Sequence, residues 1–132
     1  ARGMMAIPGA RAVEFSRGVE SSKMRGSKHN DSWHLDDDKF TLSGSDEGSA
    51  DGSLGGRSTG APMRVVVHFK PPSSISREQN TLHLPSGEQK SLRVVGRHDP
   101  VLGPRAVPVV ESIARLVIAD LGMIGGYITS SE

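Results

Sequence analysis

The chain has 132 residues, the length of one domain, and only 35% of them are apolar and 4% aromatic, which leaves little material for a hydrophobic core. Its 16 Lys and Arg residues are balanced by 15 Asp and Glu, and this balance excludes a polycationic protein that binds nucleic acid. The absence of cysteine excludes disulfides and thiolate metal sites, and three charged residues interrupt the most apolar span, 106–128, which excludes a membrane helix there.

We therefore expect a single region, residues 1–132, in the cytoplasm, without a nucleic-acid or membrane partner. Because the chain begins with Ala1 rather than Met, we also expect a processed or truncated product. The near-neutral total hides a division of charge. Residues 34–51 contain six acidic residues and one Lys, whereas residues 64–105 contain seven Lys and Arg and three acidic residues. The second segment is expected to receive an anion.

The first half of the chain predicts a strand, a short helix and a long loop. Residues 6–15 carry small and apolar residues after a Pro-Gly pair, which favours a short strand, and residues 17–24 favour a short helix that ends at Gly26. Residues 27–62 are rich in Ser, Gly and Asp, so we expect a long loop that contains one short strand or a mobile flap.

The second half predicts a strand, a hairpin and a helix. Residues 63–69 are rich in β-branched side chains, as in a strand with one buried face. Residues 81–84 and 89–95 are expected to pair as a hairpin across a turn in which Gly87 supplies a positive φ. Residues 107–121 place apolar residues at helical spacing.

Pro108 suits the first turn of this helix, and Gly122, Gly125 and Gly126 would end it. Its apolar residues cover more than one stripe, so the helix is expected to be buried on both sides. The fold class expected is α/β (α+β), a β-α-β sandwich in which an antiparallel sheet packs on a buried apolar helix. The layer on the far side of the helix would come from outside this chain, so only part of the full fold is expected here.

Two short segments carry the residues best suited to chemistry. Lys70, Pro71, Pro72, Ser73 and Ser74 follow the strongest strand, so a rigid stretch would hold an ammonium and two hydroxyls at a strand end. Arg97 offers a fork of donors for phosphate or carboxylate, and Asp99, two residues on, could orient it or act as a base. In an extended segment these two would pair and His98 would point elsewhere. A solvated lysine and a surface salt bridge are the plainer alternatives.

Other candidates are weaker. The glycine-rich segment 52–60 lets backbone amides approach an anion, but it has neither a dinucleotide fingerprint nor a P-loop ending, so a flexible loop remains the alternative. His29, His34 and the acidic run 36–38 contain suitable ligand types, yet no helical frame fixes them, and we predict no metal site. Ser73 and Ser74 lack evident His and Asp partners for a nucleophile.

Several ordered segments together resemble chorismate synthase, and the resemblance covers the carboxy-terminal part of that family. The strongest match is Gly96-Arg97-His98-Asp99-Pro100 and its continuation to Pro108. Four further segments are similar to family motifs: Ile7-Pro8-Gly9-Ala10-Arg11-Ala12-Val13-Glu14-Phe15, Met24-Arg25-Gly26-Ser27-Lys28-His29-Asn30-Asp31, Leu54-Gly55-Gly56-Arg57-Ser58-Thr59-Gly60 and Lys70-Pro71-Pro72-Ser73-Ser74-Ile75.

The resemblance implies a homotetrameric β-α-β sandwich of the shikimate pathway that uses reduced FMN. It implies the 1,4-elimination of phosphate from 5-enolpyruvylshikimate 3-phosphate to give chorismate. The residues that it assigns to FMN are Gly55, Lys70, Pro71, Pro72, Ser73, Ser74 and Arg97. Arg97 would also bind the substrate, and Asp99 would be the catalytic residue that manages a proton of the flavin ring.

Departures from the family pattern leave alternatives open. Pro72 stands where Thr is common, and Arg57 stands where an apolar residue is usual. The family's two catalytic histidines belong to an amino-terminal portion that would have to associate with this chain, which we expect to be inactive alone. A non-catalytic module that binds FMN or phosphate, or a structural fragment, is the alternative. Flavin reductase activity with NADP and the role of the acidic loop 34–51 stay open.

Overall fold

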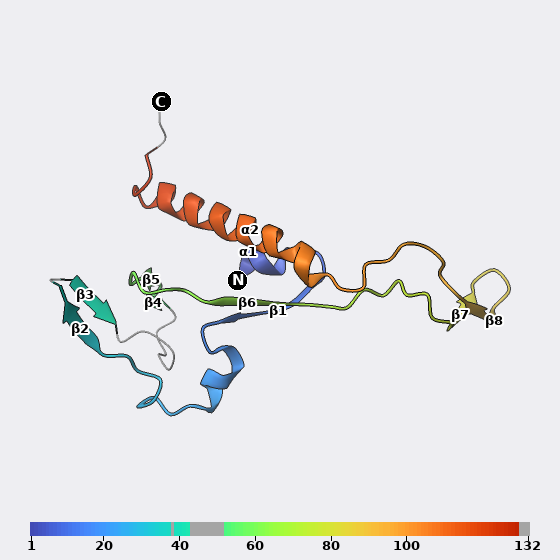
Figure 1. Cartoon of the computed structure of the whole chain (residues 1–132), viewed down its shortest axis with the longest axis horizontal. Helices are drawn as coiled ribbons and strands as arrows, with labels where there is room; N and C mark the ends of the chain where they lie inside the picture. The colour runs from blue at the N-terminus through green and yellow to red at the C-terminus, as the bar shows by residue number, and fades with distance from the viewer. Residues whose placement is uncertain (38, 43–51, 130–132) are drawn as a thin grey trace.

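The computed structural model of the chain describes residues 1–37, 39–42 and 52–129. Figure 1 shows an extended molecule in which a central layered unit lies between small hairpins. In chain order the elements are α1 (Arg2–Met5), β1 (Ala10–Phe15), the 3-10 helix η1 (Gly18–Lys23), β2 (Trp33–Asp36), β3 (Lys39–Leu42), β4 (Ser53–Leu54), β5 (Arg57–Ser58), β6 (Val65–Phe69), β7 (Gln79–His83), β8 (Glu88–Leu92) and α2 (Gly103–Ile124). The chain is therefore of mixed α and β structure, as predicted.

The central unit is one antiparallel pair of strands covered on one face by two helices. β1 pairs with β6, so that Val13 lies opposite Val67 and Phe15 opposite Val65. The side chains on this face of the sheet pack with α1 and α2 around a small core of Met4, Ile7 and Ala10. Gly3 allows the close contact of the two helices, because a Cβ at that position would lie 3.0 Å from Ile113 Cγ2.

The long helix α2 begins four residues earlier than predicted. Pro104 takes the first-turn position predicted for Pro108, and Pro108 lies inside the helix. Proline is tolerated in a first turn because the first N–H groups of a helix have no partner within it. At Pro108, by contrast, one internal hydrogen bond is lost. The carbonyl of Pro108 itself accepts a bond of 2.7 Å from the Ser112 hydroxyl.

In the described part of the chain α2 is covered on one side only, so the layer expected on its far side is not supplied by these residues. No residue of α2 is buried, and Val109, Leu116 and Ile118 leave 45%, 64% and 57% of their surface exposed. Only the side that carries Val110, Ile113 and Ala114 packs against the core. The reason is that the described residues supply one sheet layer and one helix layer, without the second sheet of a sandwich.

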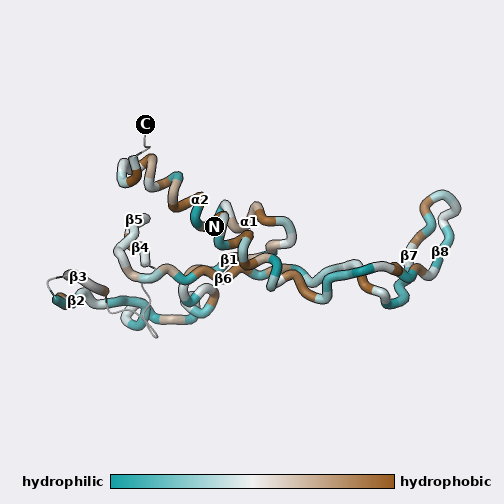
Figure 2. Tube along the Cα trace, turned by 45° about the horizontal axis from the view of Figure 1, so that its top comes forward, coloured by the Kyte–Doolittle hydropathy of each residue, from teal (hydrophilic) through white to brown (hydrophobic). Residues whose placement is uncertain are grey.

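The accessible surface of the chain is much larger than a compact protein of this mass would expose. The chain exposes 10830 Å², whereas a compact monomer of 14.0 kDa exposes about 6,700 Å². Figure 2 shows hydrophobic stretches along β6 and α2 in this open arrangement. The fold therefore leaves apolar surface available for a further polypeptide layer.

The segment expected to be a long loop, 27–62, contains more structure than predicted. Two small antiparallel hairpins, β2 with β3 and β4 with β5, replace the single short strand or mobile flap. Most of the acidic loop, residues 38 and 43–51, lies outside the described residues. The predicted hairpin of the second half is confirmed as β7 with β8. β7 begins two residues earlier than expected, and β8 begins one residue earlier.

The remaining boundaries differ modestly from the predictions. The first strand is shorter than expected, since α1 and a turn occupy residues 2–9, and the short helix at 17–24 is a 3-10 helix. Within the described part of the chain, no helix has the length and apolar character needed to cross a membrane.

Gly18 is the position where a small substitution should test the packing of β1 against η1. Its φ is +53°, and a Cβ there would collide with the Glu14 side chain. Gly18→Ala is expected to lower the free energy of unfolding by about 1–2 kcal/mol from the left-handed backbone alone. Gly87→Ala is the matched control, because Gly87 also has a positive φ, +69°, and no atom lies within 4 Å of a Cβ there. Urea unfolding followed by circular dichroism measures both, and equal midpoints would contradict this packing.

Candidate functional site

The proline-serine corner, residues Lys70 to Ser74, follows the end of β6. The Lys70 N–H donates a 2.9 Å hydrogen bond to the carbonyl of Gly9, which fixes the start of the corner to the turn before β1. Pro71 and Pro72 then restrict the backbone. Lys70, Ser73 and Ser74 are exposed, and no side-chain partner is found for them among the described residues. The corner therefore presents one ammonium and two hydroxyls to any ligand nearby.

The segment that carries Arg97 and Asp99 returns alongside this corner (Figure 1). At one end, the Arg93 Nε donates a 2.8 Å bond to the carbonyl of Ser76. At the other end, Leu102 and Phe69 both have a carbon 3.7 Å from where a Cβ on Gly9 would lie. Residues 94–101 therefore lie beside residues 70–75. The structure thus brings Arg97 and Asp99 to the same end of β6 as Lys70.

Asp99 is bound by a different arginine from the one that the sequence predicted. Its Oδ2 accepts a 2.8 Å hydrogen bond from Arg105 Nη1 in the first turn of α2, and the two side chains are 33% and 63% exposed. No interaction joins Asp99 to Arg97 among the described residues. The expected pairing assumed an extended segment, but α2 begins at Gly103 and places Arg105 within reach of the carboxylate.

Sequence reasoning missed Arg105, although one signal for it exists. A cation in the first turn of a helix is unfavourable because that end carries the positive end of the helix dipole. A carboxylate close to the arginine offsets this cost. An aspartate that precedes Pro104-Arg105 in the sequence therefore indicates an ion pair between that aspartate and Arg105. Arg97 is consequently left exposed and without a partner in the described part of the chain, which frees its guanidinium for an anion.

His98 is the one side chain with an unsatisfied buried polar atom among the described residues. Its Nε2 is buried without a hydrogen-bond partner, and the ring lies against Gly96, where a Cβ would be 3.7 Å from Nε2. Buried nitrogens of this kind are normally bonded. The site is therefore short of one polar partner beside Arg97 and Asp99.

Gly55 lies away from the other predicted site residues. It occupies the turn between β4 and β5 with φ +58°, and no atom is within 4 Å of a Cβ there. Gly52, at the base of this hairpin, contacts Ala61 and Met63, which precede β6. The proline-serine corner follows the opposite end of β6, so the structure does not bring Gly55 together with Lys70 and Arg97.

The metal hypothesis was already discounted from the sequence. The residues described by the structure contain no group of three or more His, Asp and Glu side chains able to hold a metal ion. Asp38 and the Asp36 side chain, which belong to that hypothesis, lie outside the described part.

The chorismate synthase family model matches residues 1–123 of the chain, which is most of its length. The chain belongs to the chorismate synthase family. It is 41% identical over 128 residues to the chorismate synthase of Haloquadratum walsbyi, an alignment that covers 96% of this chain and 33% of the relative. It is 43% identical over 125 residues to that of Methanocella arvoryzae, with 95% and 33% covered. The Methanococcus maripaludis protein is 40% identical over 122 residues, with 92% and 32% covered.

The chain thus spans about a third of the length of the chorismate synthases that it matches. The segments that carry the site, from the proline-serine corner to Arg105, all lie within the matched residues 1–123. The family assignment made from the sequence motifs is confirmed. The roles of individual residues follow below as proposals.

Proposed function

We propose that this chain provides one side of a chorismate synthase active site, which eliminates phosphate from 5-enolpyruvylshikimate 3-phosphate to give chorismate. The family assignment supports the reaction class. What supports the proposal for this chain is that the segment with Arg97 and Asp99 runs beside the corner that begins with Lys70, and that neither cation has a partner in the described residues. Such unpaired cations would be expected to bind phosphate and carboxylate groups.

The side chains at the corner fit a phosphorylated cofactor and an anionic substrate. Lys70, Ser73 and Ser74 can donate hydrogen bonds to phosphate oxygens. Pro71 and Pro72 limit the conformational entropy that the corner loses when it binds a ligand. Arg97 can bind two oxygens of one anion at once, so we assign it to the cofactor and to the substrate. Gly55 would contact the cofactor only from the far end of β6 or from another copy of the chain.

Reduced FMN, when bound, supplies electron density transiently to the elimination without a net redox change. The cofactor fits what the chain offers, because the orphaned Nε2 of His98 and the free donors at the corner leave polar groups to be satisfied by a ligand or partner. We assign Lys70, Pro71, Pro72, Ser73, Ser74, Arg97 and Gly55 to the FMN site.

Asp99 is assigned the proton transfer next to the flavin ring. Arg105 holds one carboxylate oxygen, Oδ2, and Oδ1 has no partner among the described residues. A carboxylate held in this way can accept a proton from a bound group and return it. Arg105 thereby acts as a positioning residue for Asp99.

Arg105→Ala is expected to change stability little and turnover more. The pair is largely exposed, so its loss should lower the free energy of unfolding by less than about 1 kcal/mol. The loss of a fixed carboxylate orientation should lower the rate of chorismate formation by about tenfold. Lys23→Ala removes a similar exposed pair, 2.7 Å from Glu20, and should affect neither reading. Equal rates for the two variants would remove Arg105 from the site.

The rest of the assembly follows from the family. We propose that a second antiparallel sheet covers α2 to complete a β-α-β sandwich, that the assembled protein is a cytoplasmic homotetramer, and that the shikimate pathway supplies its substrate. The exposed apolar side of α2 supports a second layer, because Leu116 and Ile118 would otherwise remain in water.

A second candidate is a chain that binds FMN or phosphate without catalysis, or that serves only in assembly. Pro72 and Arg57 favour it, since each departs from the family pattern. Pro72 in particular removes a hydroxyl donor from the corner. The two candidates share the same ligand chemistry and differ in turnover.

Complementation separates the candidates. The complementary portion is the part of the Methanocella arvoryzae chorismate synthase that lies outside the aligned 125 residues. The chain is mixed with reduced FMN and substrate, with and without the complementary portion, and chorismate absorbance is followed. Product only in the presence of the complementary portion is the expected result. Flavin binding without product would support the non-catalytic module. The absence of both flavin binding and product would support the structural role.

A further inference from the structure

The outer edge of β6 has no strand beside it in the described part of the chain. β6 pairs only with β1, in a sheet of two strands. The Ser16 N–H donates a hydrogen bond to the carbonyl of Arg64, so this carbonyl faces β1. Val66 and His68 lie at the next alternate positions of the register, so their backbone groups face β1 as well. Backbone groups alternate between the two edges of a strand. Those of Val65, Val67 and Phe69 therefore point away from β1, and they form a row of unused donors and acceptors.

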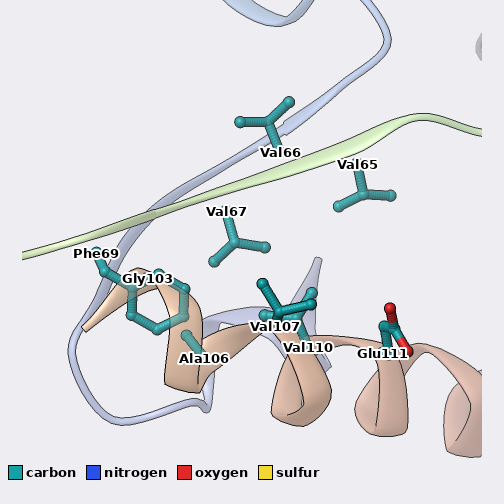
Figure 3. A pocket seen from close by; sticks show the side chains of 9 residues that line it. All are labelled: Val65, Val66, Val67, Phe69, Gly103, Ala106, Val107, Val110 and Glu111. Carbon is teal, nitrogen blue, oxygen red and sulfur yellow. The ribbon is translucent and has the colours of Figure 1, made fainter. Parts of the chain in front are cut away.

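An apolar groove runs along the same edge. It has a volume of about 380 Å³ and lies between β6 and the first turns of α2. Its principal lining side chains are Val65, Val67, Phe69, Ala106, Val107 and Val110. Figure 3 shows the side chains of Val65, Val67 and Phe69 turned toward α2, while Val66 points away from it. The open edge and the groove thus face the same space.

The open edge and the groove together determine the shape of a polypeptide that can bind there. A strand added to β6 would satisfy the outward backbone groups and direct every second side chain into the groove. The groove is almost wholly apolar, with Val107 55% exposed, so those alternate side chains must be apolar too. Glu111 stands at the rim, already bonded to Arg115, and so offers no free charge to a polar occupant.

The size of the exposed surface decides which polypeptide supplies the strand. The excess over a compact monomer is roughly 4,000 Å², whereas a standard interface covers about 800 Å² of each partner. Edge pairing between two copies of this chain would leave most of that surface open. The chorismate synthases that it matches contain about twice as many further residues as this chain spans.

We propose that the edge of β6 is a strand-addition site for the remaining two thirds of a chorismate synthase polypeptide. An extended segment with apolar residues at alternate positions pairs with Val65, Val67 and Phe69 and fills the groove against Val107. The identity of the partner rests on the proposed function, while the edge and the groove do not. The addition makes the β1 and β6 pair part of a wider sheet and holds the proline-serine corner at its end.

Amide hydrogen exchange tests this pairing residue by residue. On mixing the chain with the complementary portion, the outward amides of Val65, Val67 and Phe69 should exchange at least about tenfold more slowly. The amides of Val66 and His68 already face β1 and serve as internal controls. A complex in which the three outward amides keep their exchange rates would overturn the proposal, as would the absence of any complex.

Two variants test the groove and the edge separately. Val107→Glu places a carboxylate in the apolar groove and should weaken the complex by at least about tenfold. Val67→Pro removes an outward N–H and should weaken it similarly, whereas Val67→Ala keeps that N–H and should bind more tightly than the Pro variant. Equal binding by the Pro and Ala variants would exclude strand addition. Circular dichroism of each variant alone checks that α2 is retained.

The same samples distinguish the pairing from the reaction. Protection of the outward amides without chorismate formation would leave the strand-addition site standing and remove the proposed function. Chorismate formation with unprotected amides would leave the proposed function standing and exclude the strand-addition site. Protection that grows with the concentration of this chain alone would assign the edge to a second copy and overturn the choice of partner.

Discussion

Asp99→Asn is expected to lower the rate of chorismate formation by about 10²- to 10⁴-fold in the mixture of this chain with the complementary portion. The amide keeps the size of the side chain but cannot take up a proton as the carboxylate does. The measurement is chorismate absorbance under saturating substrate and reduced FMN. This is the largest effect expected, because general acid-base catalysis accounts for a factor of this size.

Two controls isolate the proton transfer from other effects of the substitution. Glu20→Gln removes the same charge from an exposed side chain of η1 and should leave the rate unchanged. Reduced FMN should still bind to the Asp99→Asn mixture, which shows that the site is formed. A rate within a factor of a few of the unsubstituted chain would exclude Asp99 as the group that transfers the proton.

Arg97→Ala should weaken the binding of FMN or substrate by about 1.5–3 kcal/mol, or roughly 10- to 150-fold in the dissociation constant. The guanidinium is exposed and has no partner in the described part of the chain, so its loss leaves no buried charge behind. The measured loss would then report the contact with the ligand. Flavin fluorescence titration and the substrate dependence of the rate supply the two dissociation constants.

Lys23→Ala and Arg97→Lys serve as the comparisons for Arg97. Lys23 lies in η1 and pairs with Glu20 at 2.7 Å on the exposed surface, so its removal should leave both affinities unchanged. Lys retains the charge but loses the forked donors, so Arg97→Lys should fall between Ala and the unsubstituted chain. An unchanged affinity in Arg97→Ala would reject its assignment to both ligands.

Local sequence predicted the elements on which the site is built. The β-branched run of β6, the Pro-Ser-Gly-Glu turn of the β7 and β8 hairpin and the apolar spacing of α2 each involve residues close in the chain. The same holds for the types of side chain at the proline-serine corner. Such patterns act through backbone preferences and side-chain periodicity, and these operate before any tertiary contact forms.

The family, too, could be predicted from the sequence, because several ordered motifs agree with one known pattern. The arrangement of the side chains within the site could not be predicted from the sequence. The pairing of Asp99 depends on where α2 begins, and α2 begins at Gly103, four residues before the start predicted from Pro108. The separation of Gly55 from Lys70 depends on which end of β6 each loop adjoins.

The sequence by itself determined which residue types this chain offers, their order and the secondary structure that carries them. Tertiary structure alone decided that β6 keeps one open edge and that an apolar groove lies between β6 and α2. The physical reason is that both outcomes depend on the packing of α2 against β6, two elements brought together by side chains from α1 and β1. Contacts between such distant segments are fixed only when their shared core forms.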